Sequence, residues 1–405
     1  MFRFMGILGM IVLLGVAYLL SNNRKKIDFK IVLKGALLQI AFALLILKTP
    51  IGLPFFNFFD AAIKKLLAFA DKGGDFLFAS FITGQVESPI INFAVRVLPT
   101  IIFFSALMSL LYHLKVMQFV VKGLSKLMQK LLGTSGSETL SVVGSIFVGQ
   151  TEAPLLVKPY VKSMTKSELM TVMVGGFATV AGGVMAIYVK MLDNVPGIAG
   201  HLMAASIMSA PAAIVIAKII FPETAKSETK DSAEISTSDS DSNAIEAVAD
   251  GAVDGLKLAA NIAAMLIAIV GMVALIDGLL SLADTSMAQI FGFFFKPLAF
   301  IMGIPWSEAG AFGTLLGEKI ALTELIAYKD LGVMLKNNEI SNRTAQIASY
   351  ALCGFANFAS IGIQIGGISG IAPNRKKDVA KLAMKAMLGG ALASWMTACI
   401  AGILL

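Results

Sequence analysis

The sequence predicts an all-α polytopic membrane protein with about eight transmembrane helices, two re-entrant helical hairpins of opposite orientation and interfacial amphipathic helices. The first observation behind this prediction is composition, because 57% of the 405 residues are hydrophobic and only 15% are charged. A soluble domain carries about 25% charged residues. A chain this apolar has to place most of its surface against lipid or inside a bundle within lipid. The other two observations are the length of the apolar runs and the polar interruption of two of them.

Eight apolar runs have about the 20 residues that a helix needs to cross a bilayer. The first run ends at a basic cluster rather than at a small-residue cleavage site, which indicates an uncleaved spanning helix and not a signal peptide. The eight predicted spans are Phe4–Leu20, Ile31–Ile51, Val95–Leu114, Leu169–Val189, His201–Phe221, Leu256–Leu280, Gln346–Ala372 and Leu382–Leu405.

Two further apolar segments, Thr134–Tyr160 and Ser307–Tyr328, contain glycines and carry polar or charged residues at their centres. A hairpin that enters and leaves the membrane on one side explains this pattern. Non-helical backbone survives at membrane depth only where it is buried in protein or lines a cavity. Two other segments, Asp60–Ala70 and Val116–Leu132, look amphipathic and carry lysines at helical spacing, so they are predicted to lie in the membrane interface.

Basic residues set the orientation of the spans, since short cytoplasmic loops carry an excess of lysine and arginine. Eight spans with two hairpins place four basic clusters on one face. If either hairpin were a single span, the clusters after it would move to the other face. The predicted topology puts both termini on the periplasmic or extracellular side of the inner membrane. The clusters are Arg24–Lys34, Lys115–Lys130, Lys158–Lys166 and Arg375–Lys385.

The stretch Pro222–Ala249 has no aromatic residue and many Ser, Thr, Asp and Glu residues. It cannot bury enough apolar surface to offset ordering, so it is predicted to be a flexible acidic cytoplasmic linker. A plain tether and a site of regulatory phosphorylation are both compatible with this composition. On each side of it, a polar hairpin is followed by a glycine-rich helix, and the two hairpins have opposite orientation, as in inverted-repeat transporters. The predicted divisions are 1–114 (three scaffold spans), 115–221 (interfacial helix, first hairpin and two spans), 222–249 (linker), 250–300 (scaffold span and interfacial segment) and 301–405 (second hairpin and two spans).

The centre of the first hairpin contains adjacent polar residues, Gln150, Thr151 and Glu152, followed by the helix breaker Pro154. Ionisable groups at bilayer depth are costly and are usually retained for a function. An unwound tip would expose backbone groups beside these side chains and could bind a polar solute. The alternative is that Glu152 reaches water from a loop.

The second hairpin carries Glu324 among apolar neighbours, with Lys319 five residues before it. A structural ion pair between the two is one interpretation, although helical ion pairs favour a spacing of three or four residues. A role in substrate binding is the other.

A third polar group lies in the predicted span Gln346–Ala372, where Asn357 and Ser360 are three residues apart and are expected to share a helix face. They can contact a solute or form hydrogen bonds that hold neighbouring helices together. Carboxylates, an amide, hydroxyls and a phenyl ring together suit a neutral solute with many hydroxyl groups and an aromatic face. A nucleoside fits this description, and another polyol or amide solute fits it as well.

The predicted span Leu169–Val189 contains two glycine pairs on either side of Thr179. Such glycines allow close helix packing, or a break that frees carbonyl groups to bind a small cation. Other metal chemistry is not indicated, because the two cysteines form no CxxC pattern and each of the two histidines stands alone. The formal net charge of +7 sits largely in short loops, which argues for orientation and against nucleic-acid binding.

Longer segments around these residues resemble those of the concentrative nucleoside transporters. SIFVGQTEAPLLVKPY (Ser145–Tyr160) is similar to the family's first-hairpin signature. The corresponding segments of the family are also similar to GGFATVAGGVMAIY (Gly175–Tyr188), SAPAAIVIAKIIFPET (Ser209–Thr224) and ALCGFANFASIGI (Ala351–Ile363). The likeness runs in order from about Val95 to the C-terminus.

The resemblance implies a secondary active symporter that imports nucleosides such as uridine, with no cofactor besides sodium as a coupling ion. It also implies a homotrimer in which a transport domain moves like an elevator against a scaffold. Substrate would lie between the hairpin tips and the two glycine-rich spans. Carried over by position, the base would contact Gln150, Thr151 and Glu152 with Val184 nearby, and the ribose would contact Glu324, Asn357 and Ser360, with Phe355 lining the pocket.

Two positions depart from the family pattern. The resemblance implies a sodium site formed by the positions of Ser145, Val148, Thr151, Thr179 and Val180, but sodium-coupled members carry Asn where Ser145 stands. Because some members are driven by protons and carry small hydroxyl residues there, sodium and proton coupling both stay open. The family's Asn-Glu-Phe in the second hairpin is Thr323-Glu324-Leu325 here, which could shift substrate preference.

Two other classes of function are alternatives to a symporter. An uncoupled facilitator or channel would have the same binding residues without a working cation site. An intramembrane enzyme could use paired carboxylates for acid–base chemistry, but the chain contains neither HExxH nor GxSxG. The sequence therefore favours a transporter over an enzyme.

Overall fold

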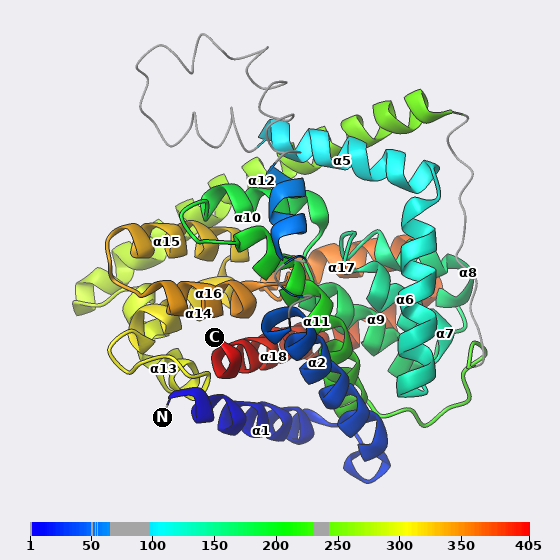
Figure 1. The fold of residues 1–405 in the computed structure, drawn as a ribbon, viewed down its shortest axis with the longest axis horizontal. Coiled ribbons are helices and arrows are strands. Elements are labelled where there is room, and N and C mark those ends of the chain that lie inside the picture. The colour runs from blue at the N-terminus through cyan, green and yellow to red at the C-terminus, as the bar shows by residue number, and fades with distance from the viewer. Residues whose placement is uncertain (1, 50–51, 53, 55, 65–97, 231–242) are drawn as a thin grey trace.

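A computed structural model of the chain describes residues 2–49, 52, 54, 56–64, 98–230 and 243–405, and these residues form helices and turns without a strand (Figure 1). The predicted all-α class is confirmed. The N-terminal half contains α1 (Phe2–Leu20), α2 (Phe29–Lys48), α5 (Leu98–His113), α6 (Val116–Leu132), α7 (Gly136–Gly144), α8 (Lys158–Val161), α9 (Lys166–Ala178), α10 (Gly182–Met191) and α11 (Ile198–Ile220). The C-terminal half contains α12 (Ala244–Leu280), α13 (Met287–Ile301), α14 (Ala309–Ala321), α15 (Glu324–Lys336), α16 (Asn342–Leu352), α17 (Phe358–Ile371) and α18 (Lys376–Leu404).

The centre of the molecule is formed by α11 and α18, which are rich in alanine and glycine and are buried along most of their length. Small residues let neighbouring backbones approach closely, which is the main source of packing energy where lipid supplies no hydrophobic drive. Gly389 and Gly390 of α18, for example, lie directly against Val174 and Phe177 of α9. The central helices therefore form the frame that positions the shorter, interrupted ones.

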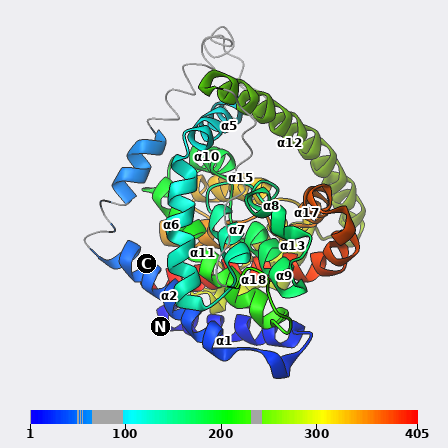
Figure 2. The same cartoon turned by 90° about the vertical axis from the view of Figure 1, so that its right-hand side faces the viewer.

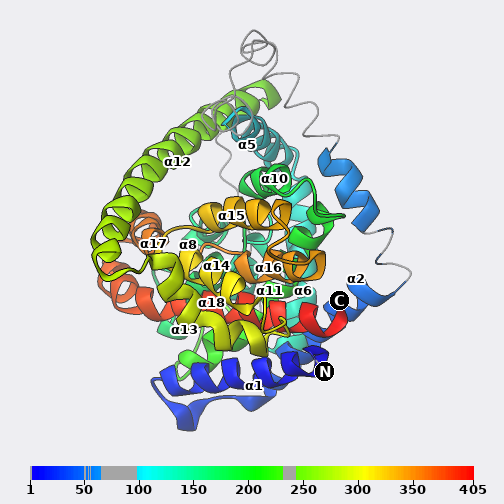
Figure 3. The ribbon, with the colours of Figure 1, turned by 90° about the vertical axis from the view of Figure 1, so that its left-hand side faces the viewer.

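α12 is the outermost long element, with 37 residues that span about 55 Å at 1.5 Å per residue. It runs along one edge from α5 to α13, outside the central helices (Figures 2 and 3). Gly251 and Gly255 bring it against the backbone of α5. Leu256 and Leu279 of α12 are exposed, as large apolar side chains are where a surface faces lipid or another apolar surface.

Both glycine-rich spans are broken. For the first span this is one of the two interpretations of its glycine pairs, and for the second it corrects the prediction of a single helix. The first is divided into α9 and α10 by residues 179–181, and the second into α16 and α17 by residues 353–357. By length and composition, four segments of the described chain can cross a membrane, or five if α5 and α6 count as one: α2, Lys166–Met191, α11 and Pro373–Leu404. The count of eight spans and the re-entrant character of the hairpins stay predictions.

The predicted interfacial segment Val116–Leu132 is the helix α6, bent by 75° from the preceding helix α5. One face of α6 buries residues at helical spacing, including Met117, Val121 and Met128, while its lysines stay exposed. This agrees with an amphipathic helix that lies across the end of a span. The predicted interfacial run Asp60–Ala70 is helical over residues 60–64, and residues 65–70 lie outside the described part.

Two of the four basic clusters are joined by direct contacts, and one of these two also contacts the end of α1, directly before a third cluster. The guanidinium of Arg375 donates to the carbonyls of Lys162 (3.2 Å) and Met164 (2.5 Å), and the amine of Lys385 donates to the carbonyl of Leu20 (3.1 Å). The fourth cluster, on α6, meets the segment that follows α11. Both termini lie at the opposite side (Figure 1). This grouping agrees with the predicted topology, whose direction across the membrane stays a prediction.

The predicted linker 222–249 is structured at both ends, contrary to the interpretation of the whole stretch as flexible. The hydroxyl of Ser227 donates to Glu168 (2.5 Å), and the carbonyl of Thr229 accepts from the amide of Gly136 (2.7 Å). These bonds attach the segment to the first turns of α7 and α9, and α12 begins at Ala244. Residues 231–242 lie outside the described part. Composition missed the docking because side-chain hydroxyls, not apolar groups, hold the segment.

A buried ion pair fixes the first hairpin to the central frame. The amine of Lys218 on α11 lies 2.6 Å from the carboxylate of Glu138 on α7, with both side chains under 5% exposed. The amine also donates to the hydroxyl of Ser167 (3.0 Å). Removing one member of such a pair leaves the other charge buried and uncompensated, which costs more than the pair itself contributes.

The substitution Lys218→Met is expected to lower the free energy of unfolding by about 3–5 kcal/mol, because Glu138 would stay buried without its partner. Both cysteines are buried, so a thiol-reactive fluorophore reports the apparent melting temperature in detergent. Lys257→Met is the matched control, since the Lys257–Asp254 pair is about 70% exposed and contributes at most about 1 kcal/mol. Equal melting temperatures for the two variants would contradict the structural role of Lys218.

Candidate functional site

The two interrupted spans cross at their breaks. Gly354, in the break between α16 and α17, has φ +100°, a left-handed conformation that side chains rarely adopt. A Cβ at this position would collide with the carbonyl of Phe177 and the backbone of Ala178, at the end of α9. The backbone of the second break therefore lies directly against the end of the helix before the first break.

The tip of the first hairpin meets the first break. After α7 ends at Gly144, residues 145–152 form turns, and the carbonyl of Phe147 accepts a hydrogen bond from the amide of Gly182 (3.0 Å), the first residue of α10. The absence of a side chain at Gly182 permits this approach, because a Cβ would lie 3.2 Å from the same carbonyl. The tip thus supplies a partner for one of the amides that begin α10.

The tip of the second hairpin meets the second break through Glu324, the first residue of α15. Its buried carboxylate accepts from the hydroxyl of Tyr188 on α10 (2.7 Å) and from the amide of Asn357 (2.7 Å). The other end of the Asn357 amide accepts from the backbone N–H of Ser360 (2.8 Å) and caps α17. This use of both ends fixes the Asn357 amide with its N–H₂ toward Glu324.

The structure therefore brings five of the eight predicted substrate residues into one region, which are Glu324 and the four residues placed around it. Asn357 and Ser360 were expected to share a helix face, but they lie at the start of α17, where Asn357 is the cap. Val184 lies one helical turn before Tyr188 on α10. Phe355, in the break itself, is half-buried and packs against the core.

The three polar residues of the first hairpin, which were expected to contact the base together, have different surroundings. Gln150 is buried beside Gly176 of α9, close to the amide of Gln364 on α17. Thr151 places its methyl group against Gly367 of α17. Glu152 is exposed, and its carboxylate folds back on Gly149, three residues earlier.

Three buried oxygen atoms near these tips find no hydrogen-bond partner within the described residues. They are the side-chain oxygens of Gln150, Thr323 and Gln364. The amide nitrogen of Gln364 donates to the carbonyl of Met173 (3.0 Å), which leaves its oxygen free to accept. Buried acceptors of this kind are costly unless something pairs with them, and the N–H and O–H groups of a polar solute are suitable partners.

The predicted cation residues offer only neutral oxygens. The hydroxyl of Ser145 donates to the carbonyl of Val142 (2.7 Å) and that of Thr179 to Gly175 (3.0 Å), so each keeps its oxygen lone pairs available. Val148 and Val180 are buried in the adjoining turns and can contribute backbone carbonyls. Hard monovalent and divalent cations take such oxygen ligands. Over the described residues, no cluster of three His, Cys, Asp or Glu side chains offers a transition-metal site.

Sequence reasoning missed two side chains of this region. Tyr188 was not singled out, because a tyrosine in an apolar helix gives no signal of the bond that it donates to Glu324. Lys319 was considered only as an ion-pair partner of Glu324. It instead donates to the carbonyls of Ala351 (2.9 Å) and Cys353 (2.9 Å) and to the hydroxyl of Ser394 (2.8 Å). Its charge in an apolar hairpin was a signal that could have found it.

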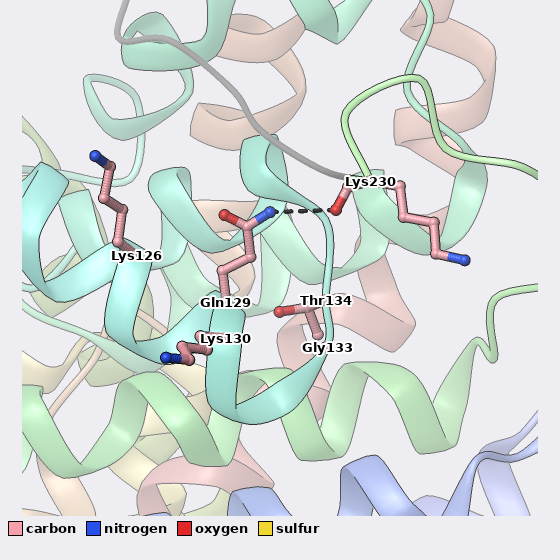
Figure 4. Close-up of a pocket in the computed structure, with 6 residues that line it drawn as sticks. All are labelled: Lys126, Gln129, Lys130, Gly133, Thr134 and Lys230. Carbon is pink, nitrogen blue, oxygen red and sulfur yellow. Dashed lines mark hydrogen bonds between the residues drawn. The ribbon is translucent and has the colours of Figure 1, made fainter.

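A pocket of about 340 Å³ opens far from these tips, at the end of α6. Figure 4 shows the amino groups of its lysines pointing away from one another, and the amide of Gln129 donating to the carbonyl of Lys230 (3.2 Å). None of the predicted site residues contributes to it, and its three lysines make it a basic surface. The lining residues are Lys126, Gln129, Lys130, Gly133, Thr134 and Lys230.

Comparison with known families matches nearly the whole chain. A family described as Na⁺ dependent nucleoside transporter matches with its C-terminal part at residues 201–402 and with its N-terminal part at residues 8–81. A family described as nucleoside recognition matches residues 94–195.

Individual proteins match over 98% of this chain. An uncharacterized transporter of Haemophilus influenzae is 45% identical, over 98% of this chain and 96% of that protein. The nucleoside permease NupC of Helicobacter pylori is 40% identical, over 98% and 96%. The sodium/nucleoside cotransporter 1 of Mus musculus is 37% identical over 98% of this chain and 63% of its own length.

Solved structures of the transporter CNTnw have the same fold. Its inward-facing substrate-bound state superposes with a TM-score of 0.93 at 42% identity, covering 99% of this chain and 98% of that one. An outward-facing state of a double variant has a TM-score of 0.93 at 41% identity, covering 100% and 98%.

The substitution Gly354→Ala is expected to lower the apparent melting temperature and the yield of folded protein, because the new Cβ would be strained at φ +100° and would collide with Phe177. Gly370→Ala on α17 is the control, since its Cβ would meet nothing within 4 Å and alanine favours a helix. Thermal unfolding of both variants in detergent measures the difference. A Gly354→Ala protein as stable as Gly370→Ala would show that the two breaks do not depend on this contact.

Proposed function

Because the chain belongs to the concentrative nucleoside transporter family, whose members are multi-pass membrane transporters, we propose that it imports nucleosides such as uridine by symport with a cation. The observation that carries this proposal is the junction of two hairpin tips with two broken spans, around the carboxylate of Glu324. Broken helices at such a junction are the usual binding device of secondary transporters, because their ends present unpaired backbone groups and side chains to a solute.

Glu324 is the proposed ligand of the ribose. A carboxylate is an acceptor with two oxygens, and vicinal hydroxyls offer two donors at matching spacing. Tyr188 and Asn357 occupy one lone pair on each oxygen and hold the carboxylate in place. Asn357 and Ser360 at the start of α17 complete the polar surface for the sugar, and Val184 and Phe355 supply its apolar walls.

The base is proposed to contact Gln150, Thr151 and Glu152. The unpartnered oxygen of Gln150 supports this assignment, since it can accept from an N–H of the base. In the described conformation Glu152 is exposed, so its contact with the base would form when the tip closes over the solute.

Coupling is proposed to use the neutral oxygens of Ser145, Val148, Thr151, Thr179 and Val180 when sodium is the ion. When a proton is the ion, a carboxyl group of the tips would carry it. The homotrimer, the inner-membrane location with periplasmic termini and the elevator-like movement are parts of the same proposal. The placement of α12 and α5 outside the core that holds both tips supports a division into scaffold and transport domain (Figure 2).

Uridine uptake into proteoliposomes with an imposed sodium gradient, an imposed proton gradient or neither tests the proposal. Accumulation of uridine above its external concentration with one gradient is expected, and it identifies the coupling ion. Accumulation driven by sodium would show that Ser145 and its neighbours still form a cation site. Equilibration without accumulation under either gradient would establish a facilitator, and chemically altered uridine would establish an enzyme.

The substitution Glu324→Gln is expected to weaken uridine binding at least tenfold. A glutamine amide would keep its oxygen for the N–H₂ of Asn357 and turn its own N–H₂ toward the hydroxyl of Tyr188. One of the two acceptor oxygens for the sugar would thus become a donor, at a cost of about 1–3 kcal/mol. Equilibrium binding to the purified protein measures the effect. Glu339→Gln, the same change on an exposed turn, is the control. Equal affinities would remove Glu324 from the proposed site.

A further inference from the structure

Lys319 is a completely buried lysine that the proposed transport mechanism does not yet use. It lies on α14, in the first helix of the second hairpin, with an exposed fraction of 0%. Over the described residues it forms no ion pair within 4.0 Å with Glu324 or any other acid. A buried charge without a paired acid has to be compensated by other polar groups, or its burial would be prohibitive.

Three oxygen atoms compensate the Lys319 ammonium. Two are the backbone carbonyls of Ala351 and Cys353, and the third is the hydroxyl of Ser394 on α18. That hydroxyl donates its own hydrogen to the carbonyl of Ala391 (3.0 Å), so its lone pairs are free to face the lysine. An ammonium has three donors, and each of them has a partner here.

The carbonyl of Ala351 belongs to the last turn of α16, and that of Cys353 belongs to the residue that caps this helix and begins the second break. The last carbonyls of a helix have no partner within the helix, and they carry the negative end of its dipole. Both helices of the second hairpin donate hydrogen bonds to this region. Tyr328 of α15 donates to the carbonyl of Ser349 (2.8 Å), and Lys319 of α14 donates to those of Ala351 and Cys353. The cationic group therefore stabilises the site at which the span is interrupted.

The first half of the chain has the same arrangement without a charged side chain. There a hairpin tip meets the end of α9, and among the bonds of the described residues only neutral hydroxyls and amides reach the backbone of that break. This is the place at which a diffusible coupling cation is proposed to bind. The two breaks therefore differ in the source of the positive charge that their helix ends would face.

We propose that Lys319 is a tethered cation, which occupies at the second break the kind of position that a diffusible cation occupies at the first and holds the second break in its substrate-binding geometry. This inference rests on the proposed function for its account of the first break. Cys353, which Lys319 binds, is followed by Gly354 and leads to Asn357, so the lysine fixes the backbone that aims Asn357 at Glu324. Lys319 is thus a positioning residue for the nucleoside site and does not contact the nucleoside.

The test uses the full chain in detergent with Lys319→Met, Lys319→Arg and Lys319→Ala. Uridine affinity and apparent melting temperature are measured for each. Lys319→Met keeps the volume without the charge and is expected to lower both, with affinity falling at least tenfold, while Lys319→Arg should retain more of both. In Lys319→Ala the missing atoms equal n-propylammonium, so adding that ion should restore affinity and melting temperature. The neutral 1-propanol, which has a similar shape, should not.

A Lys319→Met protein with wild-type affinity and melting temperature would overturn the proposal, and so would rescue by 1-propanol as complete as rescue by n-propylammonium. If none of the three variants folds, Ser394→Ala decides the matter because it keeps the lysine and removes one of its acceptors. Several-fold weaker binding than in Ser349→Ala is expected, since the hydroxyl of Ser349 bonds only within its own helix. Equal uridine affinities of Ser394→Ala and Ser349→Ala would refute the role of Lys319 as a tethered cation.

Failure of the proposed function gives a different result. A wild-type protein that binds no uridine would refute nucleoside transport alone. The melting temperatures and their rescue by n-propylammonium need no substrate, so they would still decide whether Lys319 acts as a cation at the break.

Discussion

The contact between Gly354 and the end of α9 is the constraint on which the candidate site depends. Two spans can be interrupted at the same depth only if the backbone of one approaches the backbone of the other, and a side chain at residue 354 would prevent that. Gly390 of α18 allows the same approach from the other side of Phe177. Once the two breaks cross, each hairpin tip meets a set of helix ends. The polar site is a consequence of this crossing and not an independent feature of the hairpins.

A crossing of this kind leaves backbone groups without partners in an apolar surrounding, where each unpaired group costs several kcal/mol. The chain compensates with groups from the hairpins and from the second break itself. Phe147 accepts from the amide that begins α10, Asn357 caps α17, and Lys319 binds the carbonyls that end α16. Because the same hairpins carry the candidate substrate ligands, stabilisation of the breaks and recognition of the solute are physically linked. A movement of a hairpin would alter both.

The sequence predicted the helical class, the amphipathic helix α6 and the grouping of basic clusters, because apolar periodicity and loop charge are local signals. The re-entrant character of the two hairpins stays a prediction. The sequence left a break in segment 169–189 as one of two interpretations and did not predict the break in segment 346–372. Both segments are long and mostly apolar, and tertiary partners such as Glu324 and Lys319 make the interruption of the second favourable. Asn357 was therefore assigned to a helix face, although it is the cap of a new helix. The docking of Ser227 and Thr229 was missed for the same reason, since hydrogen bonds between distant residues leave no periodic trace.

The two halves of the chain differ in how they balance the negative helix end at the break. Each break turns the negative end of a helix toward the protein interior, where low polarity makes that field strong. In the second half a lysine balances it permanently, which suits a region that has to keep Asn357 and Glu324 aligned. In the first half neutral hydroxyls leave the field unbalanced, and an ion that arrives and departs can then change the stability of that break. Under the proposed coupling, this asymmetry would let a cation leave the first break while the charge of Lys319 stays at the second.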